Sequence, residues 1–207
     1  MNIEWIYDQH IKCSPEDNAE WQRLVGRPHN HLPEKDAAGN IVPFGTGPQS
    51  LKAFRTFIVT HRPERLFEIG FNAGFSANVL FGLGVKRVFS CEIRKSNIVD
   101  EEAAKLSAIH GDAFTLYNKA SYELLKEPIQ ERFDSAFIDG GHAVNDIVVD
   151  ITVARSVGVM KFLFDDFFPL HGDTNEAIRA MGLTVDWICG NMVACTDHDR
   201  STFKKYC

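Results

Sequence analysis

Apolar positions recur at two different spacings between residues 50 and 200, and this alternation predicts the fold class. After Ser50, apolar residues return every three to four positions, which is the period of a helix with one buried face. Short apolar runs such as Leu66 and Phe67, bounded by charged residues or glycine, predict buried strands. Strands that alternate with helices form parallel sheets with right-handed crossovers. The pattern therefore predicts an α/β fold with a mostly parallel sheet and helices on both faces.

The expected elements follow one another from Ser50, which is suited to cap the first helix. Helices are expected at 51–58, 75–83, 101–107, 113–125, 144–156 and 175–181. Strands are expected at 65–69, 87–92, 108–110, 133–138 and 162–164. Segments 184–188 and 192–196 flank Gly190 and Asn191 and predict an antiparallel hairpin that finishes the sheet.

The first 48 residues have a different character, because glycine, proline and polar residues interrupt any periodicity. Segment 27–48 is expected to be a long loop, either a lid over a site or a partly disordered arm. Residues 1–207 are expected to form one domain, with 1–48 as arm or lid and 49–207 as the core. Four histidines could line a pocket there, although their spacing assigns them no role: His10, His29, His31 and His171.

Composition narrows the class of protein. The chain of 207 residues is 44% hydrophobic and carries a net charge of −6, with 28 acidic and 22 basic residues. Since no long basic run is present, a nucleic-acid partner is not expected. No apolar run approaches a membrane span or forms a signal core, so we expect no membrane partner and a cytoplasmic protein. The five cysteines fit no metal-ligand spacing and are expected to be reduced thiols.

The clearest motif is EIGFNAG at residues 68–74, directly after the first expected strand. Gly70 permits backbone angles that other residues avoid and lets a ligand approach the main chain, and Gly74 lets the next helix pack closely. A dinucleotide fingerprint requires glycine where this chain has Asn72, which argues against a nicotinamide-dependent oxidoreductase. An ordinary strand-turn-helix that uses its glycines only for geometry is the alternative.

The form E-x-G-x-x-x-G resembles the first motif of the class I S-adenosylmethionine-dependent methyltransferases. The likeness extends in motif order over roughly residues 50–200 and implies a Rossmann-like, seven-stranded sheet. It also implies that the cofactor lies at the first turn, with the Glu68 carboxylate suited to its ammonium group. The residues implied at that turn are Glu68, Gly70, Asn72, Gly74 and Ser76.

Two further acids are assigned to the cofactor. Glu92 ends the second strand, 22 residues after Gly70, where an acid accepts both hydroxyls of a ribose. Its alternative is an exposed strand-end carboxylate. Asp112 lies in the sequence HGDAF, and the resembled family often has G-D-A near the adenine amino group. Its alternative is a helix N-cap.

A second acidic group occurs in FIDGGH and FLFDDF, where Asp139 and the pair Asp165 and Asp166 end neighbouring expected strands. Carboxylates at adjacent strand ends repel one another unless a cation binds them, and hard oxygen ligands suit Mg²⁺. The pattern resembles divalent-metal O-methyltransferases of the macrocin type and, more distantly, catechol O-methyltransferases. This resemblance implies all three acids as metal ligands, with Asp139 also at the cofactor and the reacting groups. Capping of the loop or exposure to solvent is the alternative for Asp165 and Asp166.

His142 follows the glycine turn after Asp139 and is either the general base or a structural hydrogen-bond donor. Asp146 and Asp150 share a helix face and are expected to be solvated, with support of a site residue by one of them as the alternative. The resemblance implies methyl transfer to a hydroxyl of a small molecule, such as a sugar, a catechol or another natural product. A non-catalytic S-adenosylmethionine-binding or assembly protein is the alternative. The sequence leaves open whether the chain forms a homo-oligomer. One departure from the resembled family is RSVGVMKF at 155–162, which lacks the family's usual Pro-Gly-Gly turn.

Overall fold

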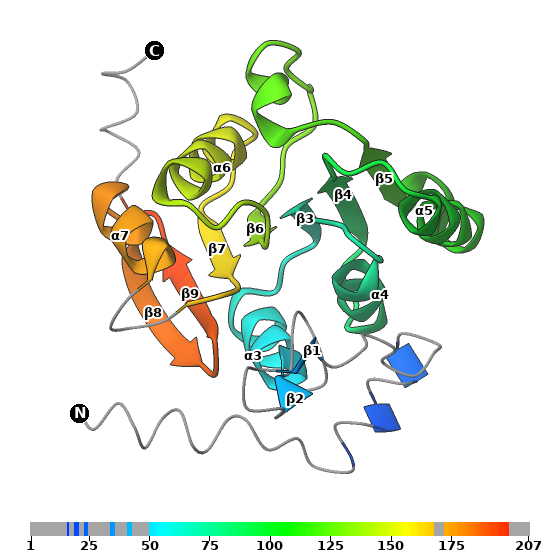
Figure 1. The fold of residues 1–207 in the computed structure, drawn as a ribbon, viewed down its shortest axis with the longest axis horizontal. Coiled ribbons are helices and arrows are strands. Elements are labelled where there is room, and N and C mark those ends of the chain that lie inside the picture. Colours follow the sequence, from blue (N-terminus) through cyan, green and yellow to red (C-terminus); the bar gives the residue numbers. More distant parts are fainter. Residues whose placement is uncertain are drawn as a thin grey trace.

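A computed structural model describes residues 50–167 and 172–198, together with positions 16, 19–20, 23–24, 34–35 and 41–42. Its centre is a seven-stranded sheet in the order β5-β4-β3-β6-β7-β9-β8 (Figure 1). Neighbouring strands are parallel from β5 to β7, whereas β9 is antiparallel to both β7 and β8. The strands are β3 Arg65–Ile69, β4 Arg87–Cys91, β5 Phe114–Tyr117, β6 Ser135–Ile138, β7 Lys161–Phe164, β8 Thr184–Cys189 and β9 Met192–Thr196. The predicted parallel sheet with a terminal hairpin is confirmed.

Helices cover both faces of the sheet, as its apolar strands require. The α-helices are α3 Leu51–His61, α4 Phe75–Gly82, α5 Asn97–His110, α6 Val144–Ser156 and α7 Asp173–Ala180, and the 3₁₀ turns are η2 Gly111–Ala113 and η3 Ser121–Leu125. Helices α3, α4 and α5 share one core with the sheet, and α6, α7 and η3 share the other (Figure 1). Successive residues of β3 face opposite sides, with Leu66 in the first core and Phe67 in the second. Within the described residues, no helix combines the length and apolar character needed to cross a bilayer.

Two expected elements are wrong. Residues 108–110 are not a strand but the last turn of α5, which begins after the Ser96 cap and ends at Gly111, a residue with φ +55°. Residues 113–125 are not a helix, because 114–117 form β5 and pair with β4. The β-favouring residues of FTLY find a neighbouring strand there, and this tertiary pairing outweighs the helical spacing. Ser50 does occupy the N-cap position of α3, but its side chain makes no capping hydrogen bond.

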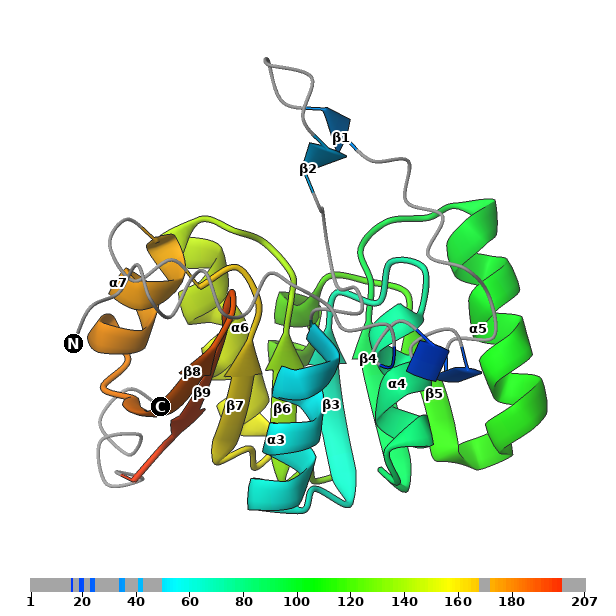
Figure 2. The same cartoon turned by 90° about the horizontal axis from the view of Figure 1, so that it is seen from below.

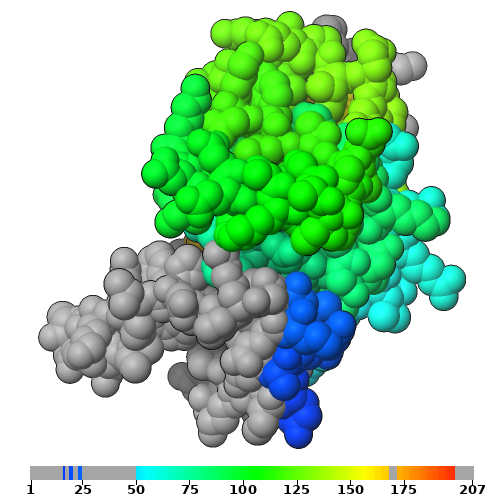
Figure 3. Space-filling model, turned by 90° about the vertical axis from the view of Figure 1, so that its right-hand side faces the viewer, coloured from blue at the N-terminus to red at the C-terminus, as the bar shows by residue number. Residues whose placement is uncertain are grey.

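The amino-terminal positions that are described lie along the flank and the upper edge of the core. The expected loop contains a two-stranded ribbon, β1 Glu34–Lys35 with β2 Ile41–Val42. Figure 2 shows this ribbon beyond the edge at which the loops after β3 and β4 lie. Leu24 packs on α4 at Gly82, and Glu20 forms an ion pair with Arg55. The described positions between 16 and 24 are the blue atoms on the side of the molecule seen in Figure 3. The four histidines discussed above lie outside the described residues, and the lid or arm stays a prediction.

Candidate active site

The site is centred where the order of the strands reverses, between β3 and β6. In open α/β sheets, ligands bind at such a switch point, beyond the carboxyl ends of the strands. The end of β3 contacts the ends of both neighbouring strands there. The Gly70 N–H donates to the carbonyl of Cys91 at the end of β4 at 3.0 Å, and the N–H of Asp139, directly after β6, donates to the Ile69 carbonyl at 2.8 Å. Gly70 has φ +98°, and a Cβ at this position would lie 1.9 Å from the Asp139 carbonyl oxygen. Only glycine fits this contact.

The turn from β3 into α4 uses further left-handed residues. Asn72 has φ +45°, a conformation that asparagine tolerates better than most residues. Gly74 is the N-cap of α4 with φ +69°, and a Cβ there would lie 2.8 Å from the Phe71 ring. The backbone of this turn therefore lies open to the crevice without side chains in the way, as the motif predicts.

Glu68 lies beneath the turn rather than in the crevice. Its side chain has no exposed surface and accepts hydrogen bonds from the hydroxyls of Ser76 on α4 and Ser90 on β4. Burial raises the pKa of Glu68 to about 7, against the opposing effect of the two serine hydrogen bonds. A ligand does not reach this carboxylate in the present conformation. Glu68 therefore affects the crevice only by supporting the turn above it, through its hydrogen bond with Ser76.

Glu92 is fixed at the carboxyl end of β4 by the same turn. Its two carboxylate oxygens accept the N–H groups of Asn72 and Arg94, each at 2.7 Å, and the residue is 5% exposed. A carboxylate has about four acceptor positions, so these two bonds leave capacity for the hydroxyls of a ribose. Ile93 follows directly and is 65% exposed, an apolar surface beside a polar anchor.

The structure does not bring Asp112 to this edge. Asp112 lies in η2 before β5, and the pairing of Phe114 with Val88 places it near the beginning of the strands. Its expected place at the carboxyl end is taken by Asn118, which follows Tyr117 of β5. The Asn118 Oδ1 atom is buried and has no hydrogen-bond partner among the described residues. A buried acceptor of this kind calls for a donor from elsewhere.

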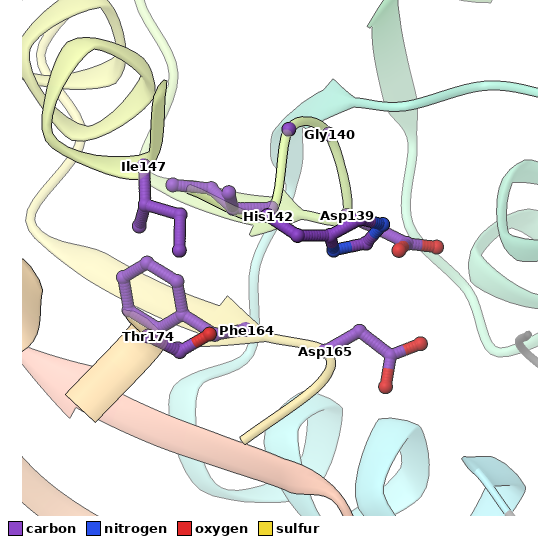
Figure 4. A pocket seen from close by; sticks show the side chains of 9 residues that line it. Asp139, Gly140, His142, Ile147, Phe164, Asp165 and Thr174 are labelled. Atoms are coloured by element: carbon purple, nitrogen blue, oxygen red, sulfur yellow. The ribbon is translucent and has the colours of Figure 1, made fainter. Parts of the chain in front are cut away.

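On the other side of the switch point a small pocket separates the ends of β6 and β7. Nine residues line it: Ile138, Asp139, Gly140, Gly141, His142, Ile147, Phe164, Asp165 and Thr174. Figure 4 shows the side chains of Asp139 and Asp165 extending toward the same side. The structure thus places Asp139, Asp165 and His142 around one pocket, and their roles stay predictions.

The third acid of the predicted metal set, Asp166, is not among the residues that line the pocket and pairs with His142. The Asp166 backbone is left-handed, with φ +53°, and its Oδ2 lies 3.2 Å from Nδ1 of His142. Asp165 is 4% exposed, and its Oδ1 accepts the Asp166 N–H at 2.9 Å and the Asn191 side-chain amide at 2.5 Å. Among the residues that the structure describes, no three acids, histidines or cysteines are grouped closely enough to hold a metal ion. The predicted three-carboxylate set is therefore not assembled here.

Asp150 corrects another expectation, since it is not solvated. It is 5% exposed, accepts the Ser121 hydroxyl at 2.5 Å, and lies under the loop after β6, where a Cβ on Gly140 would be 2.8 Å from its Oδ2. Burial raises its pKa to about 6.

The residues that sequence reasoning missed are Ser90, Asn118, Asp150 and Asn191. Only Asn118 carried a signal in the sequence, as a polar residue directly after an apolar run.

No protein-family model and no curated protein sequence matches the chain. Solved structures do match its fold. The O-methyltransferase TomG of Streptomyces achromogenes, in complex with SAM, gives a TM-score of 0.56 at 16% identity over 95% of this chain and 99% of that one. The O-methyltransferase of Bacillus cereus, in complex with SAH, gives 0.57 at 16% identity over 94% and 96%. A ribosomal protein methylase of Lactobacillus delbrueckii gives 0.52 at 17% identity over 73% and 78%.

Strand order, the glycine turn and these neighbours agree on one fold. The chain has the fold of the class I S-adenosylmethionine-dependent methyltransferases, with their mostly parallel seven-stranded sheet and antiparallel finish.

Proposed function

We propose that this protein is an S-adenosylmethionine-dependent methyltransferase that methylates a hydroxyl of a small molecule. The proposal rests on one observation: a backbone that a ligand can approach and a fixed carboxylate lie next to each other at the switch point. Gly70 keeps the backbone bare at the floor of the crevice, and Glu92 is held beside it by the Asn72 N–H. A nucleoside with a charged amino-acid tail requires both features, a close main-chain approach and a fixed ribose acceptor.

The cofactor would lie across β3, β4 and β5. Glu92 would accept the ribose hydroxyls, and the exposed side chain of Ile93 would pack on the adenine. Asn118, directly after β5, would accept the adenine amino group once its buried Oδ1 turns toward the ligand, and it would take the role that the resemblance implied for Asp112. Glu68 would act on the methionine end from beneath the turn, through Ser76 and the backbone.

The methyl group would be attacked in line by the acceptor oxygen, and the cofactor itself supplies the reactive sulfonium. His142 is placed to take the hydroxyl proton, because it borders the pocket next to Asp139 and is 68% exposed. Asp166, 3.2 Å from Nδ1, would hold the ring so that Nε2 is the basic atom. Asp139 would line both the cofactor and the acceptor, since its backbone contacts Gly70 and its side chain borders the pocket.

A divalent metal also belongs to the proposal, on a smaller set of residues than the sequence suggests. Mg²⁺ is commonly held by only one or two carboxylates together with several waters. Asp139 and Asp165, whose side chains extend to the same side of one pocket, fit that requirement (Figure 4). When bound, the ion would lower the pKa of the acceptor hydroxyl and fix its approach. Asp166 as a third ligand remains a prediction from the resemblance.

Isothermal calorimetry with S-adenosylhomocysteine tests the cofactor proposal directly. We expect micromolar binding, no binding of NAD, and a large loss of affinity in Glu92→Ala. Absence of S-adenosylhomocysteine binding by a folded wild-type protein would refute the proposal. A screen of sugars, catechols and other hydroxylated metabolites with labelled S-adenosylmethionine then separates an enzyme from a non-catalytic binding protein, because only the enzyme transfers the label.

A further inference from the structure

The tip of the C-terminal hairpin contacts Asp165, one of the residues that line the acidic pocket. Gly190 and Asn191 form the two-residue loop between β8 and β9, directly after Cys189 and before Met192. The Asn191 side-chain amide donates to Oδ1 of Asp165 at 2.5 Å. In the opposite direction, the Phe167 N–H donates to the Asn191 carbonyl at 2.7 Å. Asn191 thus contacts both Asp165 and Phe167, the first and last residues of the short segment after β7.

These contacts fix the direction of the Asp165 carboxylate. Its Oδ1 receives two donors at once, the Asn191 amide and the Asp166 N–H at 2.9 Å. Asp165 is 4% exposed, so few competing water contacts are available to turn the side chain. The chain direction changes sharply next to it, because Asp166 adopts φ +53°, an arrangement that costs about 1 kcal/mol or more and needs support from outside. The Phe167 contact to Asn191 supplies such support.

The loop itself does not require an asparagine amide. Gly190 carries the positive φ, +64°, that a type II′ turn needs at its first central residue, and Asn191 is not among the described residues with positive φ. Serine is equally accepted after glycine in such loops. The amide of Asn191 therefore has its partner in Asp165, outside the hairpin, rather than a role within its own turn.

We propose that Asn191 is a positioning residue that orients the Asp165 carboxylate for a divalent cation held between Asp139 and Asp165. The inference deepens the proposed function and rests on its metal component. Groups that hydrogen-bond a ligating carboxylate set its direction, and removing one commonly weakens metal binding by about tenfold or more. The hairpin, which in the sequence only completes the sheet, then also supports a carboxylate of the proposed site.

Metal titration of the full chain tests this inference without an acceptor substrate. Mn²⁺ is the probe, followed by electron paramagnetic resonance, with Mg²⁺ as competitor. Asn191→Ala and Asn191→Ser remove the amide, and the serine variant keeps a residue that the turn favours. The matched control is Thr196→Val, which deletes the 2.6 Å hydrogen bond from Thr196 to Asp186 at the far end of the same hairpin.

We expect both Asn191 variants to bind Mn²⁺ about tenfold more weakly than wild type. Thr196→Val should bind it as wild type does, and S-adenosylhomocysteine affinity should stay within twofold in all variants. If wild type binds Mn²⁺ and both Asn191 variants bind it equally well, the inference is overturned while the proposed function stands. If wild type binds S-adenosylhomocysteine but no Mn²⁺, the metal component fails and this inference fails with it. An equal loss of affinity in Thr196→Val would show a general weakening of the hairpin and overturn the specific role of Asn191.

Discussion

The two halves of the crevice differ in how many of their acids are exposed. On the side of β3 and β4, Glu68 and Glu92 are 0% and 5% exposed, and each carboxylate oxygen accepts a protein donor. On the side of β6 and β7, Asp165 is held in a similar way, but the side chains of Asp166 and His142 are 42% and 68% exposed and contact each other at 3.2 Å. The first half is fixed before a ligand arrives, whereas the second also has an exposed acid and an exposed histidine that can exchange partners during a reaction.

Position in the sheet explains the difference. β3 and β4 are central parallel strands, and their register sets Glu68 directly opposite Ser90. The second half is built from the loop after β6, the turn after β7 and the tip of the β8–β9 hairpin. Fixed donors reduce the entropy that a cofactor must lose on binding, and mobile acids and bases suit proton transfer. The predictions below test this contrast, beginning with the largest expected effect.

The contact between Gly70 and Asp139, where the two halves meet, is expected to be the position at which a substitution lowers stability most. Gly70→Ala would place a Cβ 1.9 Å from the Asp139 carbonyl oxygen, so the two loops must separate. Gly84→Ala is the matched control, because Gly84 has the same φ of +98° and nothing within 4 Å of an added Cβ. We expect the control to cost about 1 kcal/mol of unfolding free energy and Gly70→Ala more than about 4 kcal/mol, with loss of S-adenosylhomocysteine binding. Equal costs in urea denaturation would contradict the close contact.

The buried acid of the fixed half should make stability depend on pH. Because the pKa of Glu68 is raised from its ordinary 4.5 to about 7, the folded state holds this proton more tightly than the unfolded state. Its contribution is therefore present below about pH 4.5 and is lost as the pH rises through about 7, up to roughly 3 kcal/mol. Asp150, with a pKa raised to about 6, acts in the same direction.

Urea denaturation of wild type and Glu68→Gln between pH 4.5 and 8 measures this effect. The variant should lose less stability than wild type over that interval, and Asp150→Asn should show a smaller change of the same sign. Parallel curves for wild type and Glu68→Gln would show that Glu68 does not titrate in this range.

Cofactor affinity should depend much more on Glu92 in the fixed half than on Asp165 in the other half. Glu92→Ala removes the acceptor assigned to the ribose and the partner of the Asn72 and Arg94 N–H groups. We expect calorimetry to show about 10- to 100-fold weaker S-adenosylhomocysteine binding. Asp165→Ala, on the other half, should stay within twofold of wild type. A comparable loss in Asp165→Ala would mean that the two halves bind the cofactor together.

The smallest expected effect concerns the stability contribution of the exposed pair. His142→Ala and Asp166→Ala should each change the unfolding free energy by less than about 0.5 kcal/mol, because an exposed ion pair contributes little. Methyl transfer to an acceptor found in the screen should fall in both variants, with S-adenosylhomocysteine affinity unchanged. A double-mutant cycle in urea denaturation checks the first part, and a coupling above about 1 kcal/mol would contradict the open character of this half.

Local patterns were informative where side chains and backbone angles decide structure together. The run before Gly70 predicts a strand and the glycines predict the turn, because few other residues adopt φ +98°. The pattern failed between residues 108 and 125, where FTLY becomes β5 only through its pairing with β4. Because of that error, the expected adenine contact was assigned to Asp112, which lies at the opposite end of the strands from the candidate site. Pairing partners far away in the chain cannot be read from local spacing.

By itself, the sequence determined the order of strands and helices outside residues 108–125, the glycine turn at Gly70, and the acids at the ends of β4, β6 and β7. Tertiary structure decided how those acids are used. It buried Glu68 between two serines, paired Asp166 with His142, and set Asn191 against Asp165 from a hairpin 26 residues away. The physical reason is that a carboxylate's role depends on its burial and on its donors, and both are supplied by segments distant in the chain.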